Sequence, residues 1–228
     1  MSRIRARVPG IPRTPREALT SLQVLATLRQ QGWHRSVAGG APATYGGAPC
    51  PWFTYAAVEW LACALTEQTR LFEYGAGAST AWFARRIGEI HAVEHDEAWF
   101  GRLRQPHNGR IVLRPHPGDW WHGQDDTPYV QAIGDGAPWD VVVIDGAART
   151  ACARVAADHL TETGLVVLDD TNSPASTEAQ QVLGHRGLGR LDFWGFKPGV
   201  GTSACTTIFG RDLNPWLHAR TRRTSTDA

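Results

Sequence analysis

Residues 72–80 read FEYGAGAST, in which an apolar segment passes through two closely spaced glycines, Gly75 and Gly77, into the start of a helix. Glycine permits a sharp turn and lets backbone N–H groups approach a ligand closely. A helix that begins near Ser79 would also face that ligand with the positive end of its dipole. The stretch therefore predicts a strand, a turn and a helix that together bind a nucleotide-like molecule.

Two features of this turn distinguish between nucleotide-like cofactors. A dinucleotide fingerprint would place glycine where Thr80 stands, and it does not need an acid at Glu73. The Glu73 carboxylate would repel a pyrophosphate but attract the amino group of S-adenosylmethionine, whose own carboxylate can accept from the N–H groups of the turn. We therefore predict that adenosylmethionine contacts Glu73, Gly75, Gly77, Ser79 and Thr80.

From Arg70 onward, short apolar runs alternate with helical segments, a pattern typical of βαβ units and a parallel sheet. Two later runs have no helix between them and predict an antiparallel pair that finishes the sheet. The expected strands are residues 70–74, 89–94, 110–114, 140–145, 164–169, 189–195 and 205–209. The expected helices are residues 79–87, 97–103, 151–160 and 176–183.

Acidic residues follow the second and third predicted strands. Glu94 ends the second strand about 20 residues after the glycines, where this architecture accepts a ribose diol. Asp119 and Trp120 follow the third strand, and an acid beside an aromatic ring can hydrogen-bond and stack an adenine. We predict Glu94, Asp119 and Trp120 as further cofactor contacts.

The fourth and fifth predicted strands also end in acids, Asp145 and the pair Asp169-Asp170. The carboxyl ends of parallel strands meet at one edge of a sheet, so these acids should lie together beside the cofactor. They could hold Mg²⁺, or Asp145 could act without a metal as a base or a substrate-positioning acceptor. The predicted catalytic residues are Asp145, Asp169 and His95, with His34 as another candidate base, and Asp145 is also a candidate cofactor contact.

The N-terminal part of the chain has a different pattern. Residues 15–30 repeat apolar side chains at helical spacing, residues 32–51 are rich in Gly, Ala and Pro, and residues 52–65 are again helical in pattern. This part predicts a helical cap. Its aromatic residues could close over the cofactor; they are Trp33, Tyr45, Trp52, Phe53 and Tyr55.

The composition restricts the class of protein. A net charge of +1 over 228 residues gives no electrostatic reason to expect a nucleic-acid partner. Four widely spaced cysteines fit neither a zinc site nor a disulfide framework, and no apolar run is long enough to span a membrane. We expect a cytoplasmic protein. Lys197 is the only lysine among 23 basic residues, which we attribute to genome base composition.

The motifs together resemble the class I S-adenosylmethionine-dependent methyltransferases and, more narrowly, a bacterial group of uncharacterised small methyltransferase-like proteins. The similarity covers roughly residues 32–211 and lies in the order and spacing of the motifs. They are Gly32-Trp33 with Ser36, Pro51-Trp52-Phe53-Thr54-Tyr55, residues 72–80, Val93-Glu94-His95-Asp96, Ile144-Asp145-Gly146, Leu168-Asp169-Asp170-Thr171 and Asp192-Phe193-Trp194-Gly195.

This resemblance implies that Glu73, Gly75, Gly77 and Glu94 contact the cofactor and that Asp119 lies near the adenine. A more distant resemblance to metal-dependent small-molecule O-methyltransferases implies metal ligands after the fourth and fifth strands, here Asp145, Asp169 and Asp170. In that pattern asparagine often stands at the position of Asp170.

The expected structure is an α/β protein with a Rossmann-like methyltransferase fold. Its sheet should be mostly parallel and seven-stranded, with an antiparallel last strand, helices on both faces and a helical N-terminal cap. The expected parts are a disordered basic arm (1–16), the cap (17–66), the methyltransferase domain (67–218) and a disordered tail (219–228).

The expected activity is methyl transfer from adenosylmethionine to an oxygen or nitrogen of a small molecule such as a sugar or a secondary metabolite. The alternatives are an NAD(P)-dependent oxidoreductase and a non-catalytic protein that keeps an adenosylmethionine pocket. We expect a small-molecule acceptor as the partner and neither a nucleic acid nor a membrane, and we leave a homodimer open.

Overall fold

The computed structural model describes residue 12, residues 14–117 and residues 119–217. The predicted terminal arms, 1–16 and 219–228, lie almost entirely outside these residues. None of the described helices has the length and apolar character needed to span a membrane.

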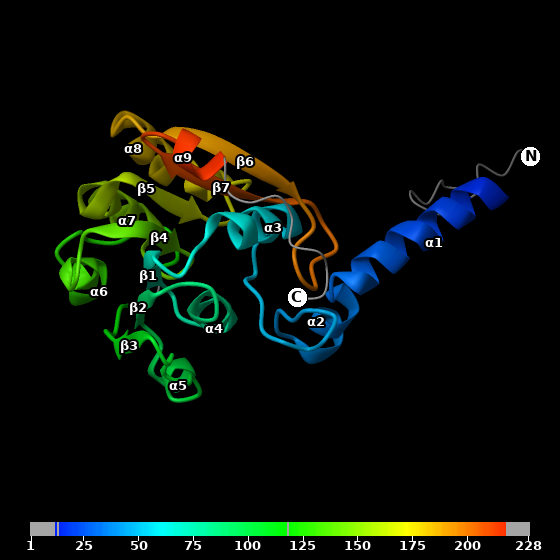
Figure 1. Cartoon of the computed structure of the whole chain (residues 1–228), viewed down its shortest axis with the longest axis horizontal. Coiled ribbons are helices and arrows are strands. Elements are labelled where there is room, and N and C mark those ends of the chain that lie inside the picture. The colour runs from blue at the N-terminus through cyan, green and yellow to red at the C-terminus, as the bar shows by residue number, and fades with distance from the viewer. Residues whose placement is uncertain (1–11, 13, 118, 218–228) are drawn as a thin grey trace, which may run out of the picture.

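A seven-stranded sheet forms the centre of the molecule, with strand order β3-β2-β1-β4-β5-β7-β6 (Figure 1). Strands β1 to β5 run parallel to one another, whereas β7 lies between β5 and β6 and is antiparallel to both. The predicted sheet is thereby confirmed. Its strands are β1 (Arg70–Tyr74), β2 (Glu89–Glu94), β3 (Gly109–Leu113), β4 (Trp139–Ile144), β5 (Leu160–Leu168), β6 (Gly189–Gly195) and β7 (Ala204–Gly210).

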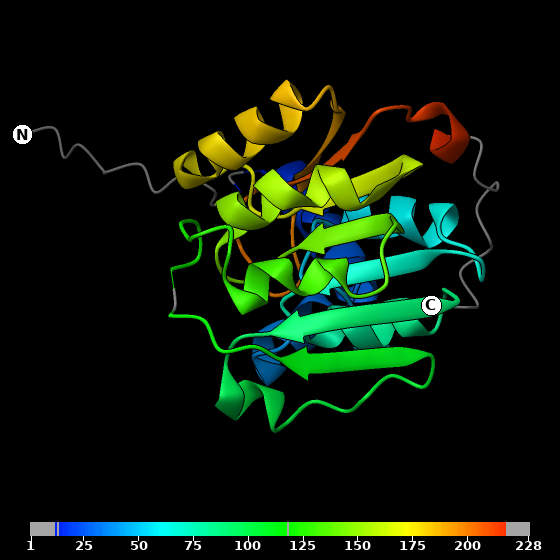
Figure 2. The same cartoon turned by 90° about the vertical axis from the view of Figure 1, so that its left-hand side faces the viewer.

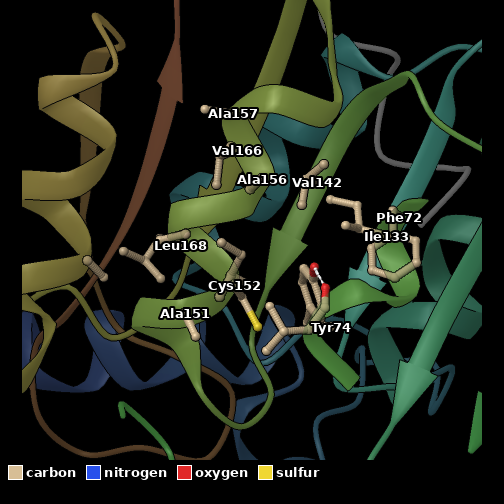
Figure 3. Close-up of a cluster of buried hydrophobic side chains, with 14 of the residues drawn as sticks. Phe72, Tyr74, Ile133, Val142, Ala151, Cys152, Ala156, Ala157, Val166 and Leu168 are labelled. Atoms are coloured by element: carbon tan, nitrogen blue, oxygen red, sulfur yellow. Dashed lines mark hydrogen bonds between the residues drawn. The ribbon is translucent and has the colours of Figure 1, made fainter. Parts of the chain in front are cut away.

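Helices cover both faces of the sheet because successive side chains of a strand point to opposite sides. On β4, Val142 and Ile144 belong to one buried cluster and Val141 and Val143 to another. Figure 2 shows three helices in front of the sheet, α6 (Pro128–Gln131), α7 (Arg149–Ala156) and α8 (Thr177–His185). All three contribute residues to the first cluster. Figure 3 shows part of this cluster between α7 and the strands. The other face packs against α3 (Tyr55–Ala64) and α4 (Ala78–Ala84).

Short helical segments complete the connections between these elements. They are α5 (Glu97–Phe100), α9 (Asn214–Leu217) and three 3₁₀ turns, η1 (Ala132–Gly134), η2 (Ala157–His159) and η3 (Pro174–Ser176).

The N-terminal helix α1 (Pro15–Gln30) projects away from the sheet in Figure 1. It begins with a capping box, in which the backbone N–H of Glu17 donates to the Thr14 side chain at 3.1 Å and the Thr14 backbone N–H donates back to Glu17 at 3.2 Å. Its bounds match the predicted helix, but several of its apolar side chains are exposed in this structure. These are Leu19, Leu22, Val24 and Leu25.

Helix α2 (Trp33–Gly39) lies in the Gly-, Ala- and Pro-rich segment 32–51, within the predicted helical cap. Two of the glycines flank the helix. Gly32 and Gly40 both adopt left-handed backbone angles, with φ of 89° and 64°, immediately before and after it. Glycine is common at such positions because it has no Cβ to clash with the backbone.

Candidate active site

The predicted site residues gather at the carboxyl ends of the central strands. Strand β1 lies between β2 and β4. From β1 the order of strands continues through β2 and β3 in one direction and through β4 and β5 in the other. In open α/β sheets such a reversal of strand order creates the crevice where ligands bind. Gly75, Glu94, Asp145 and Asp169 each directly follow or end one of the strands β1, β2, β4 and β5.

The glycine turn after β1 packs directly against the end of β4. Gly75 has a φ of 89°, and a Cβ added there would lie 2.6 Å from Cα of Gly146. Gly75 N–H donates to the carbonyl of Val93 at 2.9 Å, and Ala76 N–H donates to Glu94 Oε2 at 3.1 Å. The hydrogen bonds join the turn to the end of β2, and the close approach to Gly146 leaves no room for a side chain at Gly75.

Glu73 lies in strand β1, two residues before Gly75. Its side chain is fully buried and accepts hydrogen bonds from the hydroxyls of Ser79 and Thr80, the second at 2.5 Å. Burial raises the pKa of Glu73 to about 8, although the two hydroxyls oppose the shift. The carboxylate and both hydroxyls thus stabilise the start of α4, and direct contact of these three side chains with a cofactor stays a prediction.

We expect the free energy of unfolding of Glu73→Gln, relative to the wild type, to increase with pH. The folded-state pKa of Glu73 lies near 8, above its ordinary value of 4.5. Below pH 4.5 both states are protonated, and as pH rises towards 8 the unfolded state loses its proton first, so the wild type loses stability across this window. Glutamine does not titrate, and the difference between the two proteins should grow by roughly 3 kcal/mol across it.

Urea denaturation of the cofactor-free protein at about pH 5 and about pH 8 measures this difference. The exposed Glu162→Gln is the matched control and should show no such trend. If the difference in free energy of unfolding between Glu73→Gln and the wild type stays constant with pH, the raised pKa of Glu73 is contradicted.

Glu94 is also buried, and its carboxylate organises the backbone after β2. Oε1 accepts the backbone N–H groups of His95 at 2.7 Å and Asp96 at 2.8 Å. His95 Nδ1 lies 2.9 Å from the same oxygen, and the carboxylate raises the pKa of His95. The predicted proton-removing role of His95 stays a prediction.

The loop after β3 is fixed to the N-terminus of α7. The N–H groups of Ala148 and Arg149 donate to the carbonyls of Asp119 at 2.8 Å and Trp120 at 3.0 Å. The Trp120 ring is exposed and lies 5.7 Å from the ring of His95, centroid to centroid. The predicted adenine and ribose regions are thus neighbours, with Trp120 free to stack a planar ligand.

The three predicted acids meet after β4 and β5. Ligand atoms of Asp145, Asp169 and Asp170 all lie within 4.8 Å of one another. Two cations lie among them. Arg149 Nη2 contacts Asp145 Oδ1 at 3.0 Å, and Lys197 Nζ contacts Asp170 Oδ1 at 2.7 Å as well as Asp169 Oδ2.

Burial raises the pKa of Asp145 to about 7, although the Arg149 guanidinium opposes this shift. Asp170 has a φ of 58°, a left-handed angle that is rare outside glycine, and nearly half of its side chain is exposed. Strained backbone of this kind persists where its surroundings fix it, and here Lys197 and Arg149 both contact the Asp170 carboxylate.

Neither cation was among the predicted site residues. Lys197 lies between β6 and β7, 27 residues beyond Asp170, so no spacing rule connects them. One signal was available in the sequence: Lys197 is the only lysine among 23 basic residues. The structure shows that it is almost completely buried. A bias in genome composition explains why lysine is rare, but it does not explain why the remaining lysine is here.

These residues do not fit a divalent metal. Asp169 Oδ1 accepts from Thr206 Oγ1 at 2.6 Å, and its other oxygen contacts Lys197. Mg²⁺ needs free oxygens in near-octahedral geometry, and an ammonium group already shares the space between two of the three carboxylates.

Three of the aromatic residues that were predicted to close over a cofactor contact other parts of the protein in this structure. The indole N–H of Trp33 donates to the carbonyl of Val200 at 2.9 Å, and that of Trp52 donates to Pro198 at 2.7 Å. Phe53 is fully buried in the core. Trp33 and Trp52 therefore hold the loop between β6 and β7, and closure over a cofactor stays a prediction.

No protein-family model and no curated protein matches this chain. Among solved structures, it is similar to precorrin-6y C5,15-methyltransferase from Geobacter metallireducens GS-15, with a TM-score of 0.54 and 16% identity over 69% of this chain and 87% of that chain. It is also similar to cofactor-bound Rv0187 from MTB, with a TM-score of 0.53 and 16% identity over 89% of this chain and 100% of that chain. The chain has the Rossmann-like methyltransferase fold.

Proposed function

We propose that this chain is an S-adenosylmethionine-dependent methyltransferase that acts on an oxygen or nitrogen of a small molecule. The observation that carries the proposal is the Gly75 turn at the reversal of strand order, with Glu94 on one side of it and Asp145 on the other. This arrangement places a carboxylate for a ribose and an acid for an acceptor along one edge of the sheet.

Two observations favour adenosylmethionine over a nicotinamide cofactor. Thr80 stands where a dinucleotide fingerprint has glycine, and its hydroxyl accepts the Gly77 N–H at 2.9 Å, so the side chain is part of the turn. The doubly wound dinucleotide sheet has strand order 3-2-1-4-5-6, whereas here the antiparallel β7 lies between β5 and β6.

Asp145 is the group best placed to orient a methyl acceptor. Its side chain is one-fifth exposed, and Oδ2 has no hydrogen-bond or ion-pair partner among the described residues, whereas Oδ1 is held by Arg149. An acceptor O–H or N–H could donate to Oδ2. Transfer forms a bond from the acceptor to the methyl carbon, breaks the carbon–sulfur bond with its electrons going to sulfur, and releases the acceptor proton, which Oδ2 can take.

Isothermal titration with adenosylmethionine and its demethylated product tests the proposal without knowledge of the acceptor. We expect dissociation constants in the micromolar range for both ligands and no comparable heat with NADH. No heat and no thermal stabilisation at millimolar adenosylmethionine would refute the proposal, and tight NADH binding would favour an oxidoreductase. Binding without methylation across a broad set of acceptors would favour a non-catalytic protein.

A further inference from the structure

Lys197 is a buried, charged side chain and the only lysine of the chain. Only 6% of its surface is exposed, and its ammonium contacts carboxylate oxygens of both Asp169 and Asp170. Burying an ammonium costs several kcal/mol unless it is paired and hydrogen-bonded. The 22 arginines of the chain show that a basic residue is normally arginine here, yet this position holds the compact point charge of lysine.

The backbone around Lys197 is fixed from the N-terminal segment. The carbonyl of Phe196 accepts the backbone N–H of Tyr55 at 3.0 Å, and the carbonyl of Pro198 accepts the Trp52 indole. The Trp33 indole holds the same loop at Val200. These contacts reach both sides of Lys197 from three separate positions, so the ammonium is held in place and does not sample a mobile surface loop.

The charges of the cluster nearly balance without any added ion. Three carboxylates face two cations, which leaves one net negative charge. Of the six carboxylate oxygens, Asp145 Oδ2 alone lacks a polar partner among the described residues. A divalent cation here would lie beside the Lys197 ammonium and would turn the net charge positive.

We propose that Lys197 takes the place of a divalent metal at this edge of the sheet. Its ammonium, with the Arg149 guanidinium, holds Asp169 and Asp170 in position, keeps metal ions out and leaves Asp145 as the one acid open to an acceptor. Lys197 is thus a positioning residue. The assignment of Asp145 to an acceptor rests on the proposed function, whereas the exclusion of metal does not.

Titration of the chelator-treated, full-length wild type with Mn²⁺, followed by the electron paramagnetic resonance signal of free Mn²⁺, is the first test. We expect no specific binding at millimolar Mn²⁺ and no change in Tm with Mg²⁺. One tight Mn²⁺ site in the wild type that disappears in Asp145→Asn would overturn the proposal. The expected result concerns the wild type alone, and native circular dichroism of Asp145→Asn is the control for its use.

Lys197→Met tests whether the lysine causes the exclusion. Loss of its charge leaves three carboxylates with Arg149 alone, and Mn²⁺ should then bind at least about tenfold more tightly than to the wild type. Lys197→Arg keeps the charge and should still exclude Mn²⁺. Arg186→Met is the matched control, because it removes a cation from the exposed pair with Asp158 and should bind no Mn²⁺.

A Lys197→Met protein that has native circular dichroism and binds Mn²⁺ no better than the wild type would overturn the proposal. Titration of the same samples with the demethylated product of adenosylmethionine keeps the two questions separate. Failure of cofactor binding with the expected Mn²⁺ results would refute the proposed function and leave the role of Lys197 intact.

Discussion

Gly75→Ala is expected to lower the free energy of unfolding by about 3 kcal/mol or more and to abolish cofactor binding. The added Cβ would lie 2.6 Å from Cα and 2.8 Å from N of Gly146, which are backbone atoms at the end of β4 that cannot move aside alone. The φ of 89° adds a cost of roughly 1 kcal/mol for any residue with a Cβ. Overpacking adds about 1–3 kcal/mol more.

Gly77→Ala is the matched control for this prediction. Gly77 has an extended φ of −175°, and its added Cβ would meet only Trp99 Cζ2, at an ordinary contact distance of 3.9 Å. The free energy of unfolding of this variant should lie within about 1 kcal/mol of that of the wild type. If a cofactor lies against the turn, the methyl group should weaken its binding by about tenfold while the fold stays intact.

Urea denaturation and titration with adenosylmethionine on both variants provide the measurement. Equal stability of Gly75→Ala and Gly77→Ala would contradict the close approach of β1 and β4. Unchanged cofactor affinity in Gly77→Ala would remove the glycine turn from the binding site.

Asp169→Asn is expected to destabilise the protein by about 3 kcal/mol, because it leaves a buried ammonium with less compensation. The side chain of Asp169 is almost fully buried between Thr206 and Lys197. In Asp169→Asn/Lys197→Met, both members of the pair become neutral. The double variant should therefore be more stable than the sum of the two single effects predicts, with a coupling of about 1–3 kcal/mol.

A double-mutant cycle by urea denaturation measures this coupling, and the exposed pair Asp158–Arg186 provides the comparison. Removing either partner of that pair should cost less than about 1 kcal/mol, since water already screens it. Additive effects of Asp169→Asn and Lys197→Met would show that the two side chains do not depend on each other. Because Asp169 variants should be less stable, their activity should be measured on samples whose folded fraction is known from urea denaturation.

The local elements of this protein follow closely from its sequence. Strands β1, β2 and β6 and helix α1 have the predicted bounds, since apolar periodicity, glycine turns and caps act between near neighbours in the chain. Strand β5 is longer than predicted and begins at Leu160 rather than Gly164. Its pairing with β4 contains an irregularity that accommodates the polar residues before Gly164.

The strand-end acids, and the edge of the sheet where they meet, can be predicted from the order of residues, since parallel strands bring their carboxyl ends together. The charges that neutralise those acids come from distant segments and follow only from the folded chain. Lys197 reaches Asp169 because the loop between β6 and β7 is held by Trp33 and Trp52, more than 140 residues earlier in the chain. Local patterns fix the elements, but the path of a loop, and so the partner of a buried charge, depends on contacts between distant segments.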